Sequence, residues 1–108
     1  MNIKLNFNKK SSKIDLGVKQ AREEDGSYLI DVRSSKEYKE GHIKGSINLP
    51  LEDIEDIDVI VDDPESKIYL YCRSGKRSSQ GATILRSLGY ENVINIGGIL
   101  DWSGEMEL

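Results

Sequence analysis

The stretch Ile68-Tyr69-Leu70-Tyr71-Cys72-Arg73-Ser74-Gly75-Lys76-Arg77-Ser78 joins a short apolar segment to a basic, glycine-containing loop. Residues Ile68–Tyr71 are β-branched, aromatic or aliphatic, which is typical of a buried strand. Residues Ser78–Leu88 repeat apolar side chains at a spacing of three, which predicts a helix that Gly89 ends. Cys72 is therefore expected where a strand gives way to a helix.

Outward from this stretch, short apolar segments alternate with helical patterns. The further expected strands are Ile3–Phe7, Tyr28–Val32, Ser46–Leu49 and Val93–Ile96, and the further expected helices are Gly17–Glu24, Ser34–Gly41 and Leu51–Ile57. The segment Asn8–Lys13 is polar and predicts a loop. Ser34 and Glu37 have the spacing of a capping box. Strands that alternate with helices indicate an α/β fold around a parallel sheet of about five strands.

Composition excludes several classes of protein. The chain has 108 residues, which fits a single domain, and a net charge of −4, which argues against a general nucleic-acid binder. One cysteine cannot form an intramolecular disulfide or a multi-cysteine zinc site. No segment approaches the ~20 apolar residues of a membrane helix, and the start lacks the apolar run of a signal peptide. We therefore expect a cytoplasmic protein that acts on neither membranes nor nucleic acids.

The charge is unevenly spread along the chain. Residues Leu51–Ser66 carry eight acidic side chains and no basic one, whereas Tyr71–Gln80 carries three basic side chains and no acidic one. The acidic segment is interpreted as a solvated surface, with a partner-docking surface as the less favoured alternative. The basic segment surrounds the only cysteine.

Residues 72–78 (the Cys72 loop) carry the pattern of a reactive thiolate. Ligands of open α/β sheets bind at the carboxyl ends of strands, and a helix N-terminus offers free N–H groups to an anion. Gly75 permits the tight turn this requires, and the three cations favour a thiolate with a lowered pKa. The alternatives are an inert buried Cys72 and a catalytic pair with His42, the only histidine. His42 is flanked by glycines and is interpreted as structural.

Loop length separates two chemistries. Cysteine-dependent phosphatases place an arginine six positions after the cysteine, whereas here Ser78 stands at that position and Arg77 comes one residue earlier. We expect a ring of N–H groups one residue smaller to suit a single added sulfur atom better than a phosphoryl group.

With these pieces in place, the sequence resembles the rhodanese-like single-domain sulfurtransferases over residues 28–102. The matching segments are Leu29–Arg33, Glu37-Tyr38, Gly41–Asn48, Tyr71–Ser78, Gly97-Gly98 and Trp102. Ser46 stands where the family usually has alanine, and residues 1–13 have no counterpart in the family. The resemblance implies a single domain with a three-layer fold, in which helices cover both faces of the parallel sheet.

The resemblance also implies roles for the site residues. Cys72 would be the nucleophile that becomes a persulfide, and the backbone amides of Arg73, Ser74, Gly75, Lys76, Arg77 and Ser78 would hold that group. The side chains of Arg77, Lys76 and Arg73 would bind the anionic end of the donor. For Arg33 two interpretations stay open, a place near the donor and an ion pair with a carboxylate.

The function implied is transfer of a sulfane sulfur from thiosulfate, a persulfide or a polysulfide to cyanide or a thiol. No metal and no organic cofactor is implied. Because Cys72 is the only cysteine, an acceptor thiol has to come from another molecule, and a sulfur-relay or redox protein is an open partner. The alternatives are a non-catalytic rhodanese-like binding module and a cysteine-dependent phosphatase or arsenate reductase.

Overall fold

The computed structural model describes residues 11–108. The predicted strand Ile3–Phe7 and the first three residues of the predicted loop Asn8–Lys13 lie outside the described residues, and Lys13 belongs to a helix rather than to that loop. The other four predicted strands form a single parallel sheet in the order β3-β1-β4-β5. Their bounds are β1 (Tyr28–Asp31), β3 (Ile47–Asn48), β4 (Ile68–Cys72) and β5 (Val93–Gly98).

Strand β4 lies inside the sheet and is buried on both faces. Its side chains alternate between two cores, with Ile68, Leu70 and Cys72 facing one and Tyr69 and Tyr71 facing the other. All five are at most 1% exposed. Burial on both faces explains why this strand is apolar throughout, as is usual in parallel sheets.

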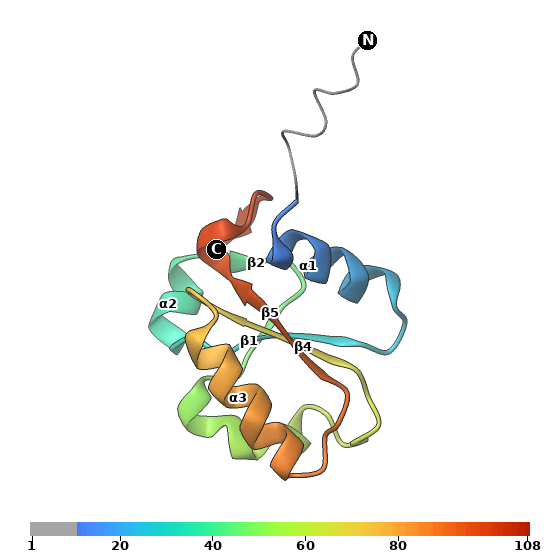
Figure 1. Cartoon of the computed structure of the whole chain (residues 1–108). Coiled ribbons are helices and arrows are strands. Elements are labelled where there is room, and N and C mark those ends of the chain that lie inside the picture. Colours follow the sequence, from blue (N-terminus) through green and yellow to red (C-terminus); the bar gives the residue numbers. More distant parts are fainter. Residues whose placement is uncertain (1–10) are drawn as a thin grey trace.

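Helices cover both faces of the sheet, as the three-layer prediction requires (Figure 1). Helix α3 (Lys76–Ser87) and the 3₁₀ helix η2 (Leu51–Val59) pack on the side of Leu70, and α1 (Lys13–Glu23) packs on the side of Tyr69. Both α1 and α3 begin earlier in the chain than their sequence patterns predict.

The short helix α2 (Ser35–Glu40) has the predicted capping box at its start. Ser34 Oγ accepts the Glu37 N–H at 3.1 Å, and Glu37 Oε1 accepts the Ser34 N–H at 3.0 Å. Because both ends of the exchange are satisfied, the Glu37 carboxylate is held in one position beside the start of the helix.

The chain ends in a second, two-stranded sheet that the sequence patterns do not predict. Strand β2 (His42–Ile43) pairs in antiparallel fashion with β6 (Met106–Glu107), after the 3₁₀ helix η3 (Ile99–Asp101). The His42 ring stacks on Tyr38, and its Nδ1 lies 2.8 Å from the Tyr38 carbonyl oxygen, which agrees with a structural role for His42.

Within residues 11–108, no helix has the length and apolar character needed to cross a membrane.

Two helical glycines give a direct test of how closely α1 approaches the sheet. A Cβ on Gly17 would overlap the Ile96 side chain of β5, whereas a Cβ on Gly81 in α3 would make ordinary contacts of 3.4 Å or more. Alanine favours a helix over glycine by about 1 kcal/mol, and overpacking costs about 1–3 kcal/mol. We therefore expect Gly17→Ala to lower the melting temperature, and the matched Gly81→Ala to leave it unchanged or raise it. Thermal unfolding followed by circular dichroism measures both, and a Gly17→Ala protein as stable as the wild type would contradict this packing.

Candidate active site

Cys72 is the last residue of β4, and α3 begins four residues later at Lys76. The intervening turn is possible because Gly75 adopts φ 99°, a left-handed conformation that side chains with a Cβ disfavour. Cys72 is 1% exposed. It is buried where the end of β4 meets the start of α3.

Backbone N–H groups of the Cys72 loop point at the sulfur. The N–H of Gly75 donates to Cys72 Sγ over an N···S distance of 3.0 Å, and the N–H of Ser78 does so over 3.3 Å. The Ser78 hydroxyl oxygen lies 3.4 Å from the same sulfur. This ring of donors surrounds the position that the sequence analysis assigns to a thiolate.

The pKa of the Cys72 thiol reflects two opposing influences. Burial raises the pKa, because a thiolate loses its hydration in the interior, whereas hydrogen bonds from the backbone N–H groups of Ser78, Gly75 and Ser74 lower it. The net effect is a pKa of Cys72 below that of an ordinary cysteine thiol. The local structure therefore favours the nucleophilic thiolate.

Asn95, on β5, is a residue of the site that the sequence analysis does not single out. Its Nδ2 donates to the Gly75 carbonyl oxygen at 3.1 Å, and its Oδ1 accepts the Ser78 hydroxyl at 2.7 Å and the Gly97 N–H at 3.0 Å. One amide side chain thus ties β5 to both ends of the turn. The sequence signal for Asn95 is a polar amide among the apolar residues of a predicted strand, two positions before the Gly97-Gly98 pair.

The end of β5 also packs against the backbone of the Cys72 loop. A Cβ on Gly98 would overlap the Arg73 carbonyl oxygen and the Ser74 Cα, so only glycine allows the loop to lie this close. The Leu100 N–H donates to the same Arg73 carbonyl at 3.2 Å. The Gly97-Gly98 pair therefore lies directly beside the Cys72 loop.

The three cations of the Cys72 loop are not equivalent. Arg73 and Lys76 are exposed, whereas Arg77 is paired with Glu37 of α2. The two guanidinium nitrogens of Arg77 meet the two carboxylate oxygens of Glu37 at 2.7 and 3.0 Å. The paired guanidinium lowers the pKa of Glu37 to about 2, against the opposing influence of burial, so the carboxylate is ionised at physiological pH.

Arg33 has the ion pair that was one of its two interpretations. It is 6% exposed, and its guanidinium donates to both carboxylate oxygens of Asp31 at 2.8–3.1 Å and to the Gly41 carbonyl oxygen at 2.7 Å. Asp31 Oδ1 also accepts the backbone N–H of Arg33 at 2.9 Å. The pair joins the end of β1 to the turn that precedes β2.

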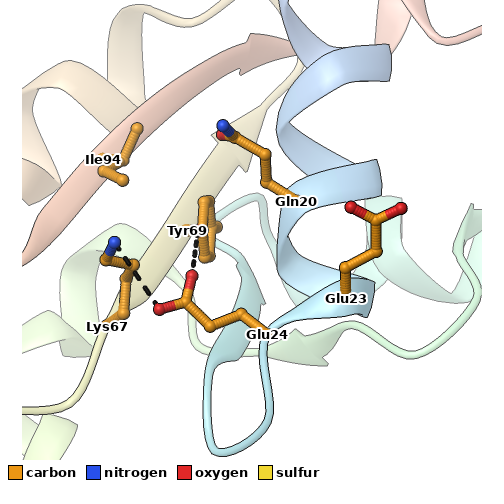
Figure 2. A pocket seen from close by; sticks show the side chains of 6 residues that line it. All are labelled: Gln20, Glu23, Glu24, Lys67, Tyr69 and Ile94. Carbon is orange, nitrogen blue, oxygen red and sulfur yellow. Dashed lines mark hydrogen bonds and ion pairs between the residues drawn. The ribbon is translucent and has the colours of Figure 1, made fainter.

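A second polar cluster lies around the start of β4, at the end of the strand away from Cys72. There, a pocket of about 330 Å³ is lined by residues that include Tyr69, Glu24 and Lys67 (Figure 2). Tyr69 Oη donates to Glu24 at 2.8 Å, and burial together with this carboxylate raises the pKa of Tyr69 to about 12. Glu24 also lies 3.5 Å from Lys67. Among residues 11–108 no group of three or more His, Cys, Asp or Glu side chains is placed to hold a metal ion.

Comparison with known proteins agrees with this fold and site. A family model described as the rhodanese-like domain matches residues 17–105. The chain belongs to the rhodanese-like domain family. The resemblance found in the sequence motifs is thereby confirmed over most of the chain.

Rhodanese-like relatives match at both the sequence and the structural level. The chain is 38% identical over 75 residues to thiosulfate sulfurtransferase PspE of Escherichia coli, covering 68% of this chain and 72% of that protein. A solved structure of a rhodanese with anions from E. coli is 35% identical, with a TM-score of 0.70 over 75% of this chain and 96% of that chain. The adenylyltransferase and sulfurtransferase uba4 of Ogataea parapolymorpha is 33% identical over 105 residues, or 96% of this chain, but the chain spans only 27% of its length.

The arrangement of this rhodanese-like site predicts a measurable shift in cysteine reactivity. Because the loop amides lower the pKa of Cys72, we expect the rate of iodoacetamide alkylation to reach half its maximum at a lower pH in the folded protein than in urea. The ordinary thiol pKa is about 8.5. The pH profile of the alkylation rate, followed by intact mass, measures both states. Equal midpoints for the folded and unfolded chains would contradict the role given to the loop amides.

Proposed function

We propose that this chain is a sulfurtransferase that moves a sulfane sulfur from thiosulfate, a persulfide or a polysulfide to cyanide or a thiol through a persulfide on Cys72. The observation that carries the proposal is the set of N–H groups from Gly75 and Ser78 that converge on Cys72 Sγ. Such donors stabilise a thiolate before the reaction and a terminal persulfide anion after it.

In the first half-reaction, the Cys72 thiolate attacks the outer sulfur of the donor. With thiosulfate, the new bond joins Cys72 Sγ to that sulfur, and the bond between the two sulfur atoms of thiosulfate breaks. Its electron pair leaves on sulfite, and the terminal persulfide sulfur retains one negative charge. No proton, oxidant or reductant is consumed in this step.

In the second half-reaction, an acceptor attacks the terminal sulfur of the persulfide. Cyanide is converted to thiocyanate, and an acceptor thiolate is converted to a new persulfide. The bond between Cys72 Sγ and the terminal sulfur breaks, and its electron pair remains on Sγ, which restores the Cys72 thiolate. This is covalent catalysis by a ping-pong route. Because Cys72 is the only cysteine of the chain, the acceptor thiol belongs to another molecule, either a small thiol or a sulfur-relay or redox protein.

The exposed cations Arg73 and Lys76 are proposed to attract the anionic end of the donor. Arg77 is proposed to contribute as well, although its ion pair with Glu37 reduces its attraction for anions. Arg33 is buried and its Nε and Nη2 donate to Asp31 and Gly41, so we assign it to shaping the end of β1, with contact to the donor as the alternative. We place this activity in a single cytoplasmic domain spanning residues 1–108, with residues 1–13 as an additional segment.

The length of the Cys72 loop favours sulfur over phosphate chemistry. The last amide that donates to Sγ belongs to Ser78, six residues after Cys72, where the phosphatase pattern has an arginine. The side chain of the preceding Arg77 is directed to Glu37. The loop thus has no arginine at the sixth position to bind a phosphoryl group, which supports a small terminal sulfur as the group that it accommodates.

A mass measurement tests the proposal directly. After incubation with thiosulfate and removal of the excess, we expect the intact mass of the wild-type chain to increase by one sulfur atom, because the persulfide is covalent. Addition of cyanide should remove that sulfur and release thiocyanate in equal amount. The measurement is intact-mass spectrometry with a colorimetric thiocyanate assay.

Cys72→Ser is the matched control, since it changes one atom at the reacting position. It should take up no sulfur and release no thiocyanate. Failure of the wild type to acquire sulfur from thiosulfate or polysulfide would support the binding-module alternative. Turnover of an aryl phosphate that is lost in Cys72→Ser would instead support a phosphatase.

A further inference from the structure

The carboxylate of Glu37 is held from two sides. Its Oε1 accepts the Ser34 N–H of the capping box at 3.0 Å and one Arg77 nitrogen at 2.7 Å, while its Oε2 meets the second Arg77 nitrogen at 3.0 Å. Two parallel N–H···O bonds fix an arginine more firmly than a single contact does. The capping box of α2 therefore determines where Arg77 of α3 is held.

This pairing changes the charge that a donor meets. Arg77 belongs to the Cys72 loop, between Gly75 and Ser78, whose N–H groups donate to Cys72 Sγ at 3.0 and 3.3 Å. The Glu37 hydrogen bonds raise the pKa of the Arg77 guanidinium, and the charge of the nearby Cys72 thiolate adds to this effect. With Glu37 ionised, the pair contributes no net charge, and the positive potential of the Cys72 loop comes from Arg73, Lys76 and the backbone N–H groups.

The ion pair of Arg77 and Glu37 is accessible from solvent. Arg77 and Ser34 line a cavity of about 260 Å³ together with Pro50, Leu51 and Glu52. The side chains of Arg77 and Glu37 are 36% and 29% exposed, so the bond between them is accessible to a competing anion. Glu52 is an exposed second acid at this cavity, which reduces its attraction for anions further.

We propose that Glu37 is a specificity-determining residue, which neutralises Arg77 and thereby limits the preference of the site for doubly charged donors over singly charged ones. The inference rests on the proposed sulfurtransferase function, which it extends to the charge class of the donor. With Glu37 in place, monoanionic persulfides and thiosulfonates compete with dianionic thiosulfate on more equal terms, because the electrostatic attraction of a donor is proportional to its charge.

Glu37→Gln isolates this charge from the structure around it. Glutamine is accepted at the same position of a capping box, so Ser34 and α2 keep their hydrogen bonds. The matched control is Glu40→Gln, which makes the same change in net charge at an exposed position of the same helix. Both variants should fold with the circular dichroism spectrum of the wild type.

The first measurement compares kcat/KM for two donors, thiosulfate with charge −2 and benzenethiosulfonate with charge −1. For Glu37→Gln we expect an increase of about fivefold with thiosulfate and about twofold with benzenethiosulfonate, as the loss of one partly exposed ion-pair partner implies. Glu40→Gln should change both by less than Glu37→Gln does. Equal factors for the two donors, or equal effects of the two variants, would overturn the proposal.

A second measurement does not depend on sulfur transfer. Iodoacetate and iodoacetamide alkylate the same thiolate and differ by one negative charge, so the ratio of their rates reports the potential at Cys72 independently of its pKa. Glu37→Gln should raise the ratio about twofold relative to wild type. An unchanged ratio refutes the inference about Glu37. A wild type that acquires no sulfur while the ratio rises refutes instead the proposed function.

Discussion

The hydrogen bonds from the Gly75 and Ser78 amides to Cys72 Sγ are the interaction on which the site depends. They exist because a buried parallel strand ends at the cysteine and a helix begins at once, with its first N–H groups unpaired within the helix. The burial that would suppress a thiolate also brings these donors close to it. The donors outweigh the desolvation, and a reactive sulfur can therefore sit in a nearly closed position.

That arrangement requires support from an element distant in the sequence. Asn95 bonds to the Gly75 carbonyl and to the Ser78 hydroxyl, and Gly98 leaves room for the Arg73 backbone. Both residues belong to β5, the neighbour of β4 in the sheet. A substitution in β5 would therefore alter the position of the Cys72 loop, although β5 carries no reacting atom.

The charges are arranged in a similar way around the sulfur. Glu37 and Arg77 come from different helices and form a bidentate pair beside the loop, whereas Asp31 and Arg33 form a buried pair beneath the turn that leads to β2. Net charge therefore says little about the potential at the site. A chain of net charge −4 has a basic loop because its acids are concentrated in another segment, residues 51–66, of which Glu52 shares a cavity with Arg77.

Sequence alone determined the α/β class, four of the strands of the central sheet, the capping box at Ser34 and the location of Cys72 at a strand end, because each follows from local periodicity, turn residues or spacing. It also placed three cations around the cysteine, but it could not assign their partners. Only the tertiary structure decided that Arg77 meets Glu37, forty residues away, that Asn95 holds the loop, and that β2 pairs with β6. These contacts join segments that are far apart in the chain, so they depend on how the sheet and helices pack rather than on any local pattern.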